Sequence, residues 1–331
     1  MIDLQRLPKA ELHLHIEGTF EPELIFALSE RNGVPLPYPD VQSLRDAYQF
    51  SDLQSFLDLY YAAMGVLRTE RDFYELTSAY AQRAVTQGVR HAEIFFDPQA
   101  HLQRGIAFET VVDGITAALD DARRRTGLTS HLIMCFLRDL PAQAAFETLE
   151  RAKTRRDRIL AVGLDSAEVG NPPSKFATVF EQARAQGYLT VAHAGEEGPP
   201  EYIWQALDLL KVSRIDHGVR CLEDEKLVQR LRRQRTPLTV CPFSNVRLRV
   251  VDTLAHHPLK RMLDAGLVAT VNSDDPAYFG GYIGDNFQGV AADLHLTDDD
   301  IVTLARNSFE GAFIDDMTRS RFLAEIEALH V

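Results

Sequence analysis

Several features that would place a chain in a special class are scarce in this sequence. It contains only three cysteines, Cys135, Cys221 and Cys241, each within an apolar run, so we expect buried free thiols rather than disulfides or a metal cluster. No apolar run approaches the roughly 18 residues of a membrane span, so no membrane partner is expected. Residues 1–8 lack the basic start and apolar core of a secretory signal, and we therefore expect a cytoplasmic protein.

Positive charge is also in short supply. The 35 lysines and arginines are outnumbered by 48 aspartates and glutamates, which gives a formal net charge of −13. Such a surface repels a phosphate backbone, so we expect a small-molecule substrate and no nucleic acid partner. The 331 residues, 45% hydrophobic and 25% charged, contain no Ser/Gly linker or internal repeat. We therefore expect a single domain over residues 1–331.

The chain alternates short apolar runs with longer stretches of helical periodicity, the pattern of a parallel sheet. Eight apolar runs predict eight strands, at residues 10–16, 89–97, 129–137, 159–166, 188–195, 214–219, 237–242 and 268–275. Most of them are separated by roughly 15 to 35 residues with helical spacing, as a (β/α)8 TIM barrel in the α/β class requires. The gap at about 20–88 is longer and contains several helical patterns, at residues 22–32, 52–66 and 70–87, so we expect a helical insertion after the first strand.

Two histidines one residue apart, His13 and His15, stand near the end of the first predicted strand. Residues two apart on a strand point to the same face, so both imidazoles project from one side, as two ligands of a metal ion would. The Glu17 and Gly18 that follow indicate that the strand breaks just after the pair, where a loop opens onto a pocket. The alternative is a half-exposed strand in which histidines merely alternate with leucine and isoleucine.

Three later strands also end in polar residues. The segments VAHAGE (191–196), IDHG (215–218) and VNSDDP (271–276) each pass from an apolar stem into histidine or acidic residues. In a β/α barrel the carboxyl ends of the strands meet on one face, where catalytic groups gather. Singly, each polar residue is explained as a satisfied strand histidine or a helix cap. Core packing does not explain polar residues at four strand ends on one rim, so together they predict a catalytic site.

Four motifs in this order, HLHIEG, HAGEEG, DHGV and NSDDPAYFGG, resemble those of the adenosine and adenine deaminase family of metal-dependent hydrolases. The likeness spans nearly the whole chain. Within the family, the segments LPKAELHLHIEGT, GLDSAEVG and CPFSN are similar to the adenine deaminases of bacteria and fungi. The resemblance implies a β/α barrel, one Zn²⁺ per chain and the hydrolytic deamination of adenine to hypoxanthine and ammonia, a reaction of purine salvage.

The resemblance implies that His13, His15, His193 and Asp274 hold the metal, as three neutral nitrogen ligands and one carboxylate oxygen. An open position then remains for a water molecule, whose pKa a bound zinc ion lowers from about 15.7 to about 7. Iron, manganese and cobalt are alternatives to zinc. Related hydrolases with two metals use a lysine in the fourth strand, and residues 159–166 contain none, so we expect one metal.

Three residues are expected to handle protons and the purine. Glu196, on the same rim as His193, is suited to protonate ring nitrogen N1, which requires a pocket that raises its pKa. We expect His217 to hold the attacking water, with Asp274 as proton acceptor. Asp275 would grip the N7 edge of the purine, because neighbouring side chains on a strand point in different directions.

Two neighbouring acids are alternatives for these roles. Glu197 adjoins Glu196 and is the weaker candidate for the proton donor. Asp216 is expected to orient a metal ligand rather than to bind the metal itself. A lid over the site would come from the insertion at 20–88 or from the glycine-rich loop 278–282.

Two residues depart from the adenosine deaminase pattern and point to a free base as substrate. Glu17 is one methylene longer than the aspartate usual after the histidine pair, so we expect it to crowd out the ribose. Glu168 stands where adenosine deaminases have glycine, and its carboxylate would accept the N9 hydrogen that only a free base has. The alternative for Glu168 is a loop residue that pairs with Lys175.

Two other functions remain open on the same residues. One is deamination of adenosine or of a modified 6-aminopurine. The other is a non-catalytic purine-binding relative, which should lack a ligand, acid or base residue, and none is missing from the motifs above.

Overall fold

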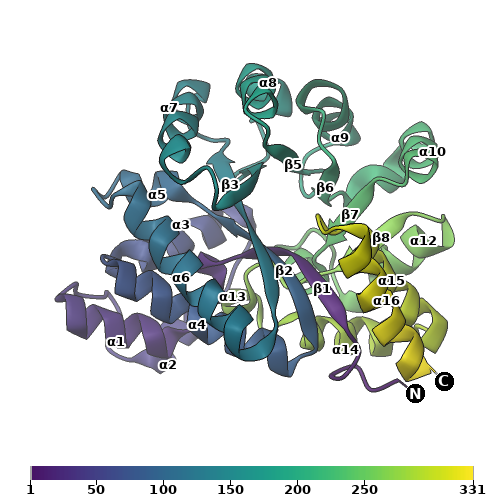
Figure 1. The fold of residues 1–331 in the computed structure, drawn as a ribbon, viewed down its shortest axis with the longest axis horizontal. Coiled ribbons are helices and arrows are strands. Elements are labelled where there is room, and N and C mark those ends of the chain that lie inside the picture. Colours follow the sequence, from purple (N-terminus) through teal and green to yellow (C-terminus); the bar gives the residue numbers. More distant parts are fainter. Residues whose placement is uncertain (1, 331) are drawn as a thin grey trace.

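Eight parallel strands follow one another in chain order around a nearly closed barrel (Figure 1). The structure is a computed structural model and describes residues 2–330. The strands are β1 (Lys9–His15), β2 (Val89–Phe96), β3 (Thr129–Leu137), β4 (Ile159–Asp165), β5 (Leu189–Ala194), β6 (Arg214–His217), β7 (Pro237–Val240) and β8 (Val268–Val271). The (β/α)8 barrel predicted from the alternation of apolar runs and helical stretches is confirmed.

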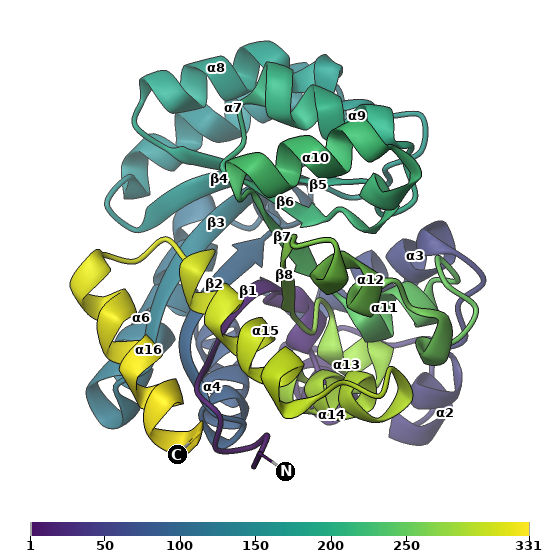
Figure 2. The same ribbon diagram turned by 90° about the vertical axis from the view of Figure 1, so that its right-hand side faces the viewer.

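Helices surround the barrel and cover its outer face (Figure 1). They are α1 (Pro22–Asn32), α2 (Val41–Asp46), α3 (Leu53–Ala63), α4 (Glu70–Thr86), α5 (Pro98–Leu102), α6 (Phe108–Thr126), α7 (Ala142–Ala152), α8 (Ala177–Ala185), α9 (Pro200–Gln205), α10 (Glu225–Gln234), α11 (Pro242–Arg247), α12 (Leu259–Asp264), α13 (Pro276–Phe279), α14 (Ile283–Asp293), α15 (Asp298–Glu310) and α16 (Asp316–His330). Figure 2 shows α15 across the outside of β1 and β8, both of which it contacts. Between residues 2 and 330, no helix is long and apolar enough to cross a membrane.

The barrel closes where the end of β1 meets the segment after β8. The backbone N–H of His15 donates to the carbonyl of Asp274 at 3.0 Å, and the N–H of Asp274 donates to the carbonyl of His13 at 3.1 Å. Two residues earlier on the β8 side, the side chain of Asn272 bridges the two segments, because its Oδ1 accepts the N–H of Leu12 at 2.8 Å. This closure brings Asp274 directly beside the histidine pair.

The long segment between β1 and β2 contains four helices, α1 to α4. The sequence predicted α1, α3 and α4 but not α2, a helix of six residues that is too short to show a periodic pattern. A capping box starts α2, in which the side chain of Asp40 accepts the N–H of Ser43 at 2.8 Å. Helix α4 packs against α6 and β2 on the barrel wall, whereas α1 to α3 gather on the side away from both termini (Figure 1).

A small apolar layer fills the inside of the barrel. It consists of Phe95 from β2, Ile133 and Cys135 from β3, Ala161 from β4 and Val191 from β5, all fully buried. The ring of Phe95 lies 4.9 Å from the rings of both predicted metal-binding histidines of β1, so this layer forms the floor of the site above it. The three cysteines are buried and free, as expected.

Candidate active site

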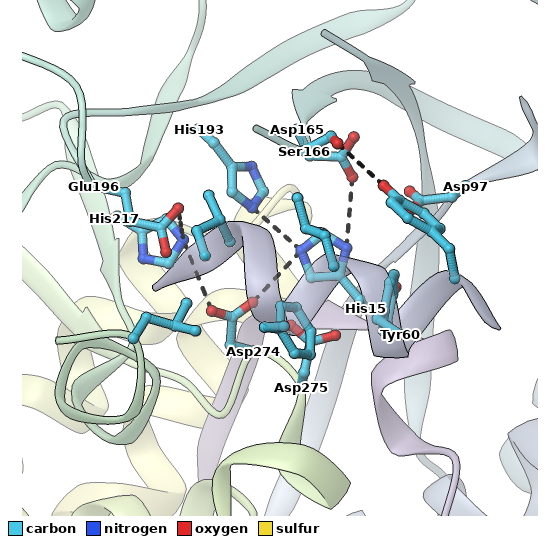
Figure 3. A pocket seen from close by; sticks show the side chains of 15 residues that line it. His15, Tyr60, Asp97, Asp165, Ser166, His193, Glu196, His217, Asp274 and Asp275 are labelled. Atoms are coloured by element: carbon cyan, nitrogen blue, oxygen red, sulfur yellow. Dashed lines mark hydrogen bonds and ion pairs between the residues drawn. The ribbon is translucent and has the colours of Figure 1, made fainter. Parts of the chain in front are cut away.

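The four predicted metal ligands come together at the carboxyl ends of the strands. His13 and His15 belong to β1, His193 to β5, and Asp274 follows β8, and all four are buried. Nε2 of His13 lies 3.2 Å from Oδ1 of Asp274, and Nε2 of His15 lies 3.5 Å from the same oxygen. The Nε2 atoms of His15 and His193 are 3.2 Å apart (Figure 3).

These separations fit the ligands of a single metal ion. Ligand atoms about 2.0–2.2 Å from a tetrahedrally coordinated ion lie roughly 3.4 Å from one another. Within the described part of the chain, Nε2 of His13 is buried without a hydrogen-bond partner. Such an atom is costly to bury unless a cation takes its lone pair. The cluster therefore has the composition and geometry of a metal site.

His217, at the end of β6, stands between this cluster and Glu196. Its Nε2 lies 3.8 Å from Oδ2 of Asp274 and 3.4 Å from Oε2 of Glu196 (Figure 3). The ligand atoms of His13, His193, His217 and Asp274 lie within 4.8 Å of one another. A water molecule between the cluster and Glu196 would be within reach of the His217 ring.

Buried acceptors face the other side of two of the predicted metal-binding imidazoles. Nδ1 of His13 lies 2.9 Å from Oγ1 of Thr239, and this hydroxyl donates to Oδ1 of Asp216 at 2.9 Å. Nδ1 of His193 faces Oδ2 of Asp216 at 3.9 Å. Arg214 in turn donates from Nε to Asp216 at 3.3 Å. With Nδ1 protonated toward these acceptors, Nε2 of each ring presents its lone pair to the cluster.

Burial disfavours the charged form of three of the histidines. It lowers the pKa of His15 to about 4 and that of His217 to about 3, and it holds the pKa of His193 well below its usual range. Burial acts to raise the pKa of Asp274, but the nearby histidines, His13 first, outweigh it and lower that pKa. Neutral imidazoles and an ionised carboxylate are the protonation states that metal binding requires.

Left-handed backbone turns two of these side chains toward the site. Both His217 and Asp274 have φ of 62°, a region that side chains other than glycine seldom occupy. The positive φ of His217 coincides with the end of β6, and β8 ends at Val271, so both strands are shorter than the predicted 214–219 and 268–275. Residues held in such conformations cluster at functional sites.

Glu196 lies in the turn after β5 and points into the same pocket (Figure 3). Burial raises the pKa of its carboxyl well above the usual range, and the charges of Asp274 and Glu168 raise it further. A carboxyl that is protonated at neutral pH can donate a proton to a substrate. Glu197, the alternative donor, is only partly buried and lies outside the pocket wall.

The pocket lies directly above the cluster of histidines and Asp274. Helix α3 supplies much of its wall, through Leu53, Phe56, Leu57, Tyr60 and Tyr61. These residues belong to the segment in which the sequence placed a candidate lid.

Two carboxylates on the far side of His15 from Glu196 were not singled out from the sequence (Figure 3). Asp97 follows β2 and Asp165 ends β4, and both line the pocket with Ser166. Oδ2 of Asp165 lies 3.5 Å from Nδ1 of His15. Burial raises the pKa of Asp97 well above its usual range and that of Asp165 to about 7. Their signal was present, because both follow apolar strands at the rim where Asp274 was found.

Asp275 lies in the pocket wall beside Asp274 (Figure 3). Among residues 2–330 its Oδ1 has no hydrogen-bond partner, although it is buried. Burial raises the pKa of Asp275 well above its usual range, and the charge of Asp274 raises it further. A Cβ at Gly18 would lie 2.0 Å from Oδ1 of Asp275, so the glycine of the HLHIEG motif is required by this close approach.

The structure gives Glu17 different contacts from those predicted. Its Oε1 accepts the N–H of Asp97 at 3.2 Å and lies 2.7 Å from Nε2 of His101 on α5. Glu17 is buried and is not among the residues that line the pocket, so its predicted role in excluding the ribose stays a prediction. The partner that draws it away, His101, is 84 residues distant in the chain and leaves no local signal.

The contacts of Glu168 also differ from the prediction. Both of its oxygens accept backbone N–H groups of the turn 195–198, so the carboxylate does not face the purine pocket. The predicted alternative is wrong as well, because Nζ of Lys175 donates to the carbonyl of Arg138 and to Oδ1 of Asn171.

An eight-stranded β/α barrel that gathers histidines and carboxylates at the carboxyl ends of its strands is the architecture of a metal-dependent hydrolase. The model of one family, described as Adenosine deaminase, matches residues 8–329. The chain therefore belongs to the adenosine deaminase family.

Several relatives match nearly the whole chain. It is 63% identical to the adenine deaminase of Streptomyces coelicolor, over 98% of this chain and 96% of that protein. It is 55% identical to the adenine deaminase of Acinetobacter baylyi, over 98% of each. The solved structure of an adenine deaminase from Arthrobacter aurescens is similar with a TM-score of 0.96 and 55% identity, covering 97% of this chain and 98% of that one. An amidohydrolase from Burkholderia ambifaria with bound Zn has a TM-score of 0.89 and 28% identity, covering 99% and 92%.

Proposed function

We propose that this protein catalyses the hydrolytic deamination of adenine to hypoxanthine and ammonia. The observation that carries the proposal is the 55–63% identity, over nearly the full length, to proteins named adenine deaminase. The site supports it independently, since the buried carboxyl of Glu196 lies beside a cluster of histidines and Asp274 in a small pocket.

The proposed cofactor is one Zn²⁺ per chain, held by His13, His15, His193 and Asp274. Three imidazole nitrogens and one carboxylate oxygen suit zinc, and the related amidohydrolase from Burkholderia ambifaria has bound Zn. The chemistry that zinc supplies when bound is a water molecule whose pKa falls from about 15.7 to about 7.

The protein residues around that water then divide the proton transfers. His217 orients the water, since its Nε2 lies between Glu196 and Asp274. Asp274 accepts a proton from the water, and Glu196 donates a proton to N1 of the purine, which makes C6 easier to attack. Asp274 then passes its proton to the 6-amino group, which leaves as ammonia, and the remaining proton of the attacking water returns to Glu196 as the C6 oxygen becomes a carbonyl. Asp275, protonated in its buried position, donates a hydrogen bond to N7.

The shape of the pocket supports a free base as the substrate. Side chains of α3 close the cavity above the metal cluster, and a nucleoside would have to displace them to seat its sugar. We assign the selection of adenine over adenosine to this wall rather than to Glu17 and Glu168, because neither of these residues lines the pocket.

The test is ammonia release from adenine and from adenosine, measured side by side on a sample whose metal content is determined. We expect turnover of adenine with about one zinc per chain and little turnover of adenosine. Equal or faster turnover of adenosine would establish the nucleoside as the substrate instead, and inactivity at full metal occupancy would indicate a binding relative. The variant Glu196→Gln should keep the metal and lose about 10²–10⁴-fold in kcat.

A further inference from the structure

Glu168 binds the turn that carries the proposed proton donor. Its Oε1 accepts the N–H of Gly195 at 2.7 Å, and its Oε2 accepts those of Glu196 at 3.1 Å, Glu197 at 2.8 Å and Gly198 at 2.7 Å. Four successive N–H groups therefore converge on one carboxylate, in the kind of backbone concavity that binds anions. Glu168 is fully buried, so these bonds are shielded from water.

Both glycines of the turn have a structural reason. A Cβ at Gly198 would lie 2.6 Å from Cδ of Glu168, so only glycine permits the carboxylate to come this close. Gly195 has φ of 72°, and a Cβ there would lie 2.4 Å from Ile203. The segments GLDSAEVG and HAGEEG, which are separate in the sequence, thus form one packed unit.

A buried arginine completes the unit. Arg138 is fully buried and donates from Nη1 to the carbonyl of His193 at 2.7 Å and from Nε to the carbonyl of Asn171 at 2.9 Å. It therefore holds the end of β5 while Glu168 holds the residues that follow. Burial lowers the pKa of Arg138 and the charge of Glu168 opposes this effect, so each charge compensates the other.

We propose that Glu168 is a positioning residue, which fixes Glu196 at the orientation needed for proton transfer to the purine. The inference rests on the proposed function, because it assigns Glu196 its role as donor. Glu168 itself is neither a lining residue of the pocket nor a member of the metal cluster, so it acts on the site through its bonds to the turn. A shift of about 1 Å in a catalytic group can cost about 10²-fold in rate.

The first test is Glu168→Gln in the zinc-loaded enzyme. Glutamine keeps the size of the side chain, but its NH2 group faces N–H donors and cannot accept from them. We expect kcat for adenine to fall about 10- to 100-fold and KM to change by less than about threefold, because Asp275 and the α3 wall hold the purine. The exposed Glu201→Gln, just beyond the turn, is the matched control and should keep the kcat of the wild type.

A double-mutant cycle separates positioning from general support of the fold. In the Glu196→Gln background the donor is already absent, so adding Glu168→Gln should not lower the residual rate further. If Glu168→Gln lowered kcat in the Glu196→Gln background by the same factor as in the wild type, the inference would be overturned. An unchanged kcat in the single variant Glu168→Gln would overturn it too.

A second variant keeps the test decisive if Glu168→Gln does not fold. Gly198→Ala presses on the same carboxylate from the turn side, and it should reproduce the loss in kcat with metal content unchanged. Unchanged kcat in Gly198→Ala would overturn the inference. Wild-type enzyme that fails to release ammonia from adenine would instead overturn the proposed function, so the two failures are distinguishable.

Discussion

The buried carboxylates of this protein differ in protonation and in role, and the contacts of each carboxylate determine both. Glu93 is ionised because Arg214 outweighs the effect of burial and lowers the pKa of Glu93 to about 2. Within residues 2–330 no arginine or lysine forms an ion pair with Glu196, and burial raises the pKa of this carboxyl instead. Glu168 accepts four backbone N–H groups. The same functional group is therefore a structural anion at Glu93, and the proposed roles are proton donor at Glu196 and positioning group at Glu168.

The effect of one buried carboxylate, Asp216, can be tested by measuring the affinity for zinc. Asp216 accepts a hydrogen bond from the hydroxyl of Thr239, which in turn contacts Nδ1 of His13. Its other oxygen faces Nδ1 of His193. We predict that Asp216→Asn lowers zinc affinity about 10- to 100-fold, because an amide cannot hold both rings in the binding tautomer. Competition with a chromophoric chelator measures the affinity. The exposed Asp208→Asn is the control, and equal affinities in both variants would contradict the prediction.

Helix α3 illustrates how an element outside the barrel can shape the site. One face of the helix packs into an aromatic cluster, in which the ring of Phe56 lies 5.4 Å from Phe50, 5.1 Å from Tyr60 and 4.7 Å from Phe279. The same residue lines the pocket. Packing of the helix and closure of the pocket are therefore coupled.

We predict that Phe56→Ala loosens this wall. Removal of a buried ring should lower the free energy of unfolding by about 3–5 kcal/mol and raise the KM for adenine several-fold, because the pocket loses part of its enclosure. Urea unfolding and steady-state kinetics measure the two effects. Gln54→Ala, on the exposed side of α3, should change neither value. An unchanged KM in Phe56→Ala would show that α3 does not enclose the substrate.

The proposed metal site joins distant parts of the chain, since the residues that would hold the ion come from β1, β5 and the segment after β8. We predict that removal of metal by a chelator lowers the thermal midpoint and abolishes ammonia release, and that added zinc restores both. Free zinc at about a thousand times its Kd would stabilise the fold by about 4 kcal/mol. His193→Ala should show no such dependence on the chelator. Identical midpoints with and without metal in the wild type would contradict the prediction.

Global stability should also depend on pH through a histidine far from the motifs. His257 is buried, with Nε2 3.0 Å from Oδ1 of Asn245 and Nδ1 accepting the N–H of Leu259 at 3.1 Å. Burial lowers the pKa of His257 to about 4, from 6.5 in the unfolded chain. Between these values the unfolded state binds more protons, so the free energy of unfolding falls as the pH drops from 6.5 toward 4.

The contribution amounts to at most roughly 3 kcal/mol. We predict that His257→Gln removes this part of the decline, which urea unfolding at pH 7 and pH 5 would measure. His256→Gln, at an exposed neighbouring position, should decline as the wild type does. Equal declines in all three proteins would contradict the prediction.

Local sequence patterns were enough to predict the barrel and much of the cluster. The spacing of His13 and His15 predicts one shared face, because strand residues alternate, and that face does meet Asp274. His193, Glu196 and His217 were found because each follows an apolar strand stem. Strand alternation and an apolar stem before a polar residue are patterns of a few neighbouring residues, so they can be identified from the sequence.

The roles of Glu17, Glu168, Asp97 and Asp165 could not be predicted in this way. Each acid follows or ends a strand near the same rim, and the sequence does not distinguish those that face the pocket from those that face away. His101 draws Glu17 out of the site, and the turn 195–198 captures Glu168, leaving Asp97 and Asp165 to line the cavity. Strand order and the chemistry of the rim were thus legible in the chain, whereas the direction of each carboxylate depended on hydrogen-bond donors that only folding brings near. A buried carboxylate must find such donors, and the strongest available set decides where it points.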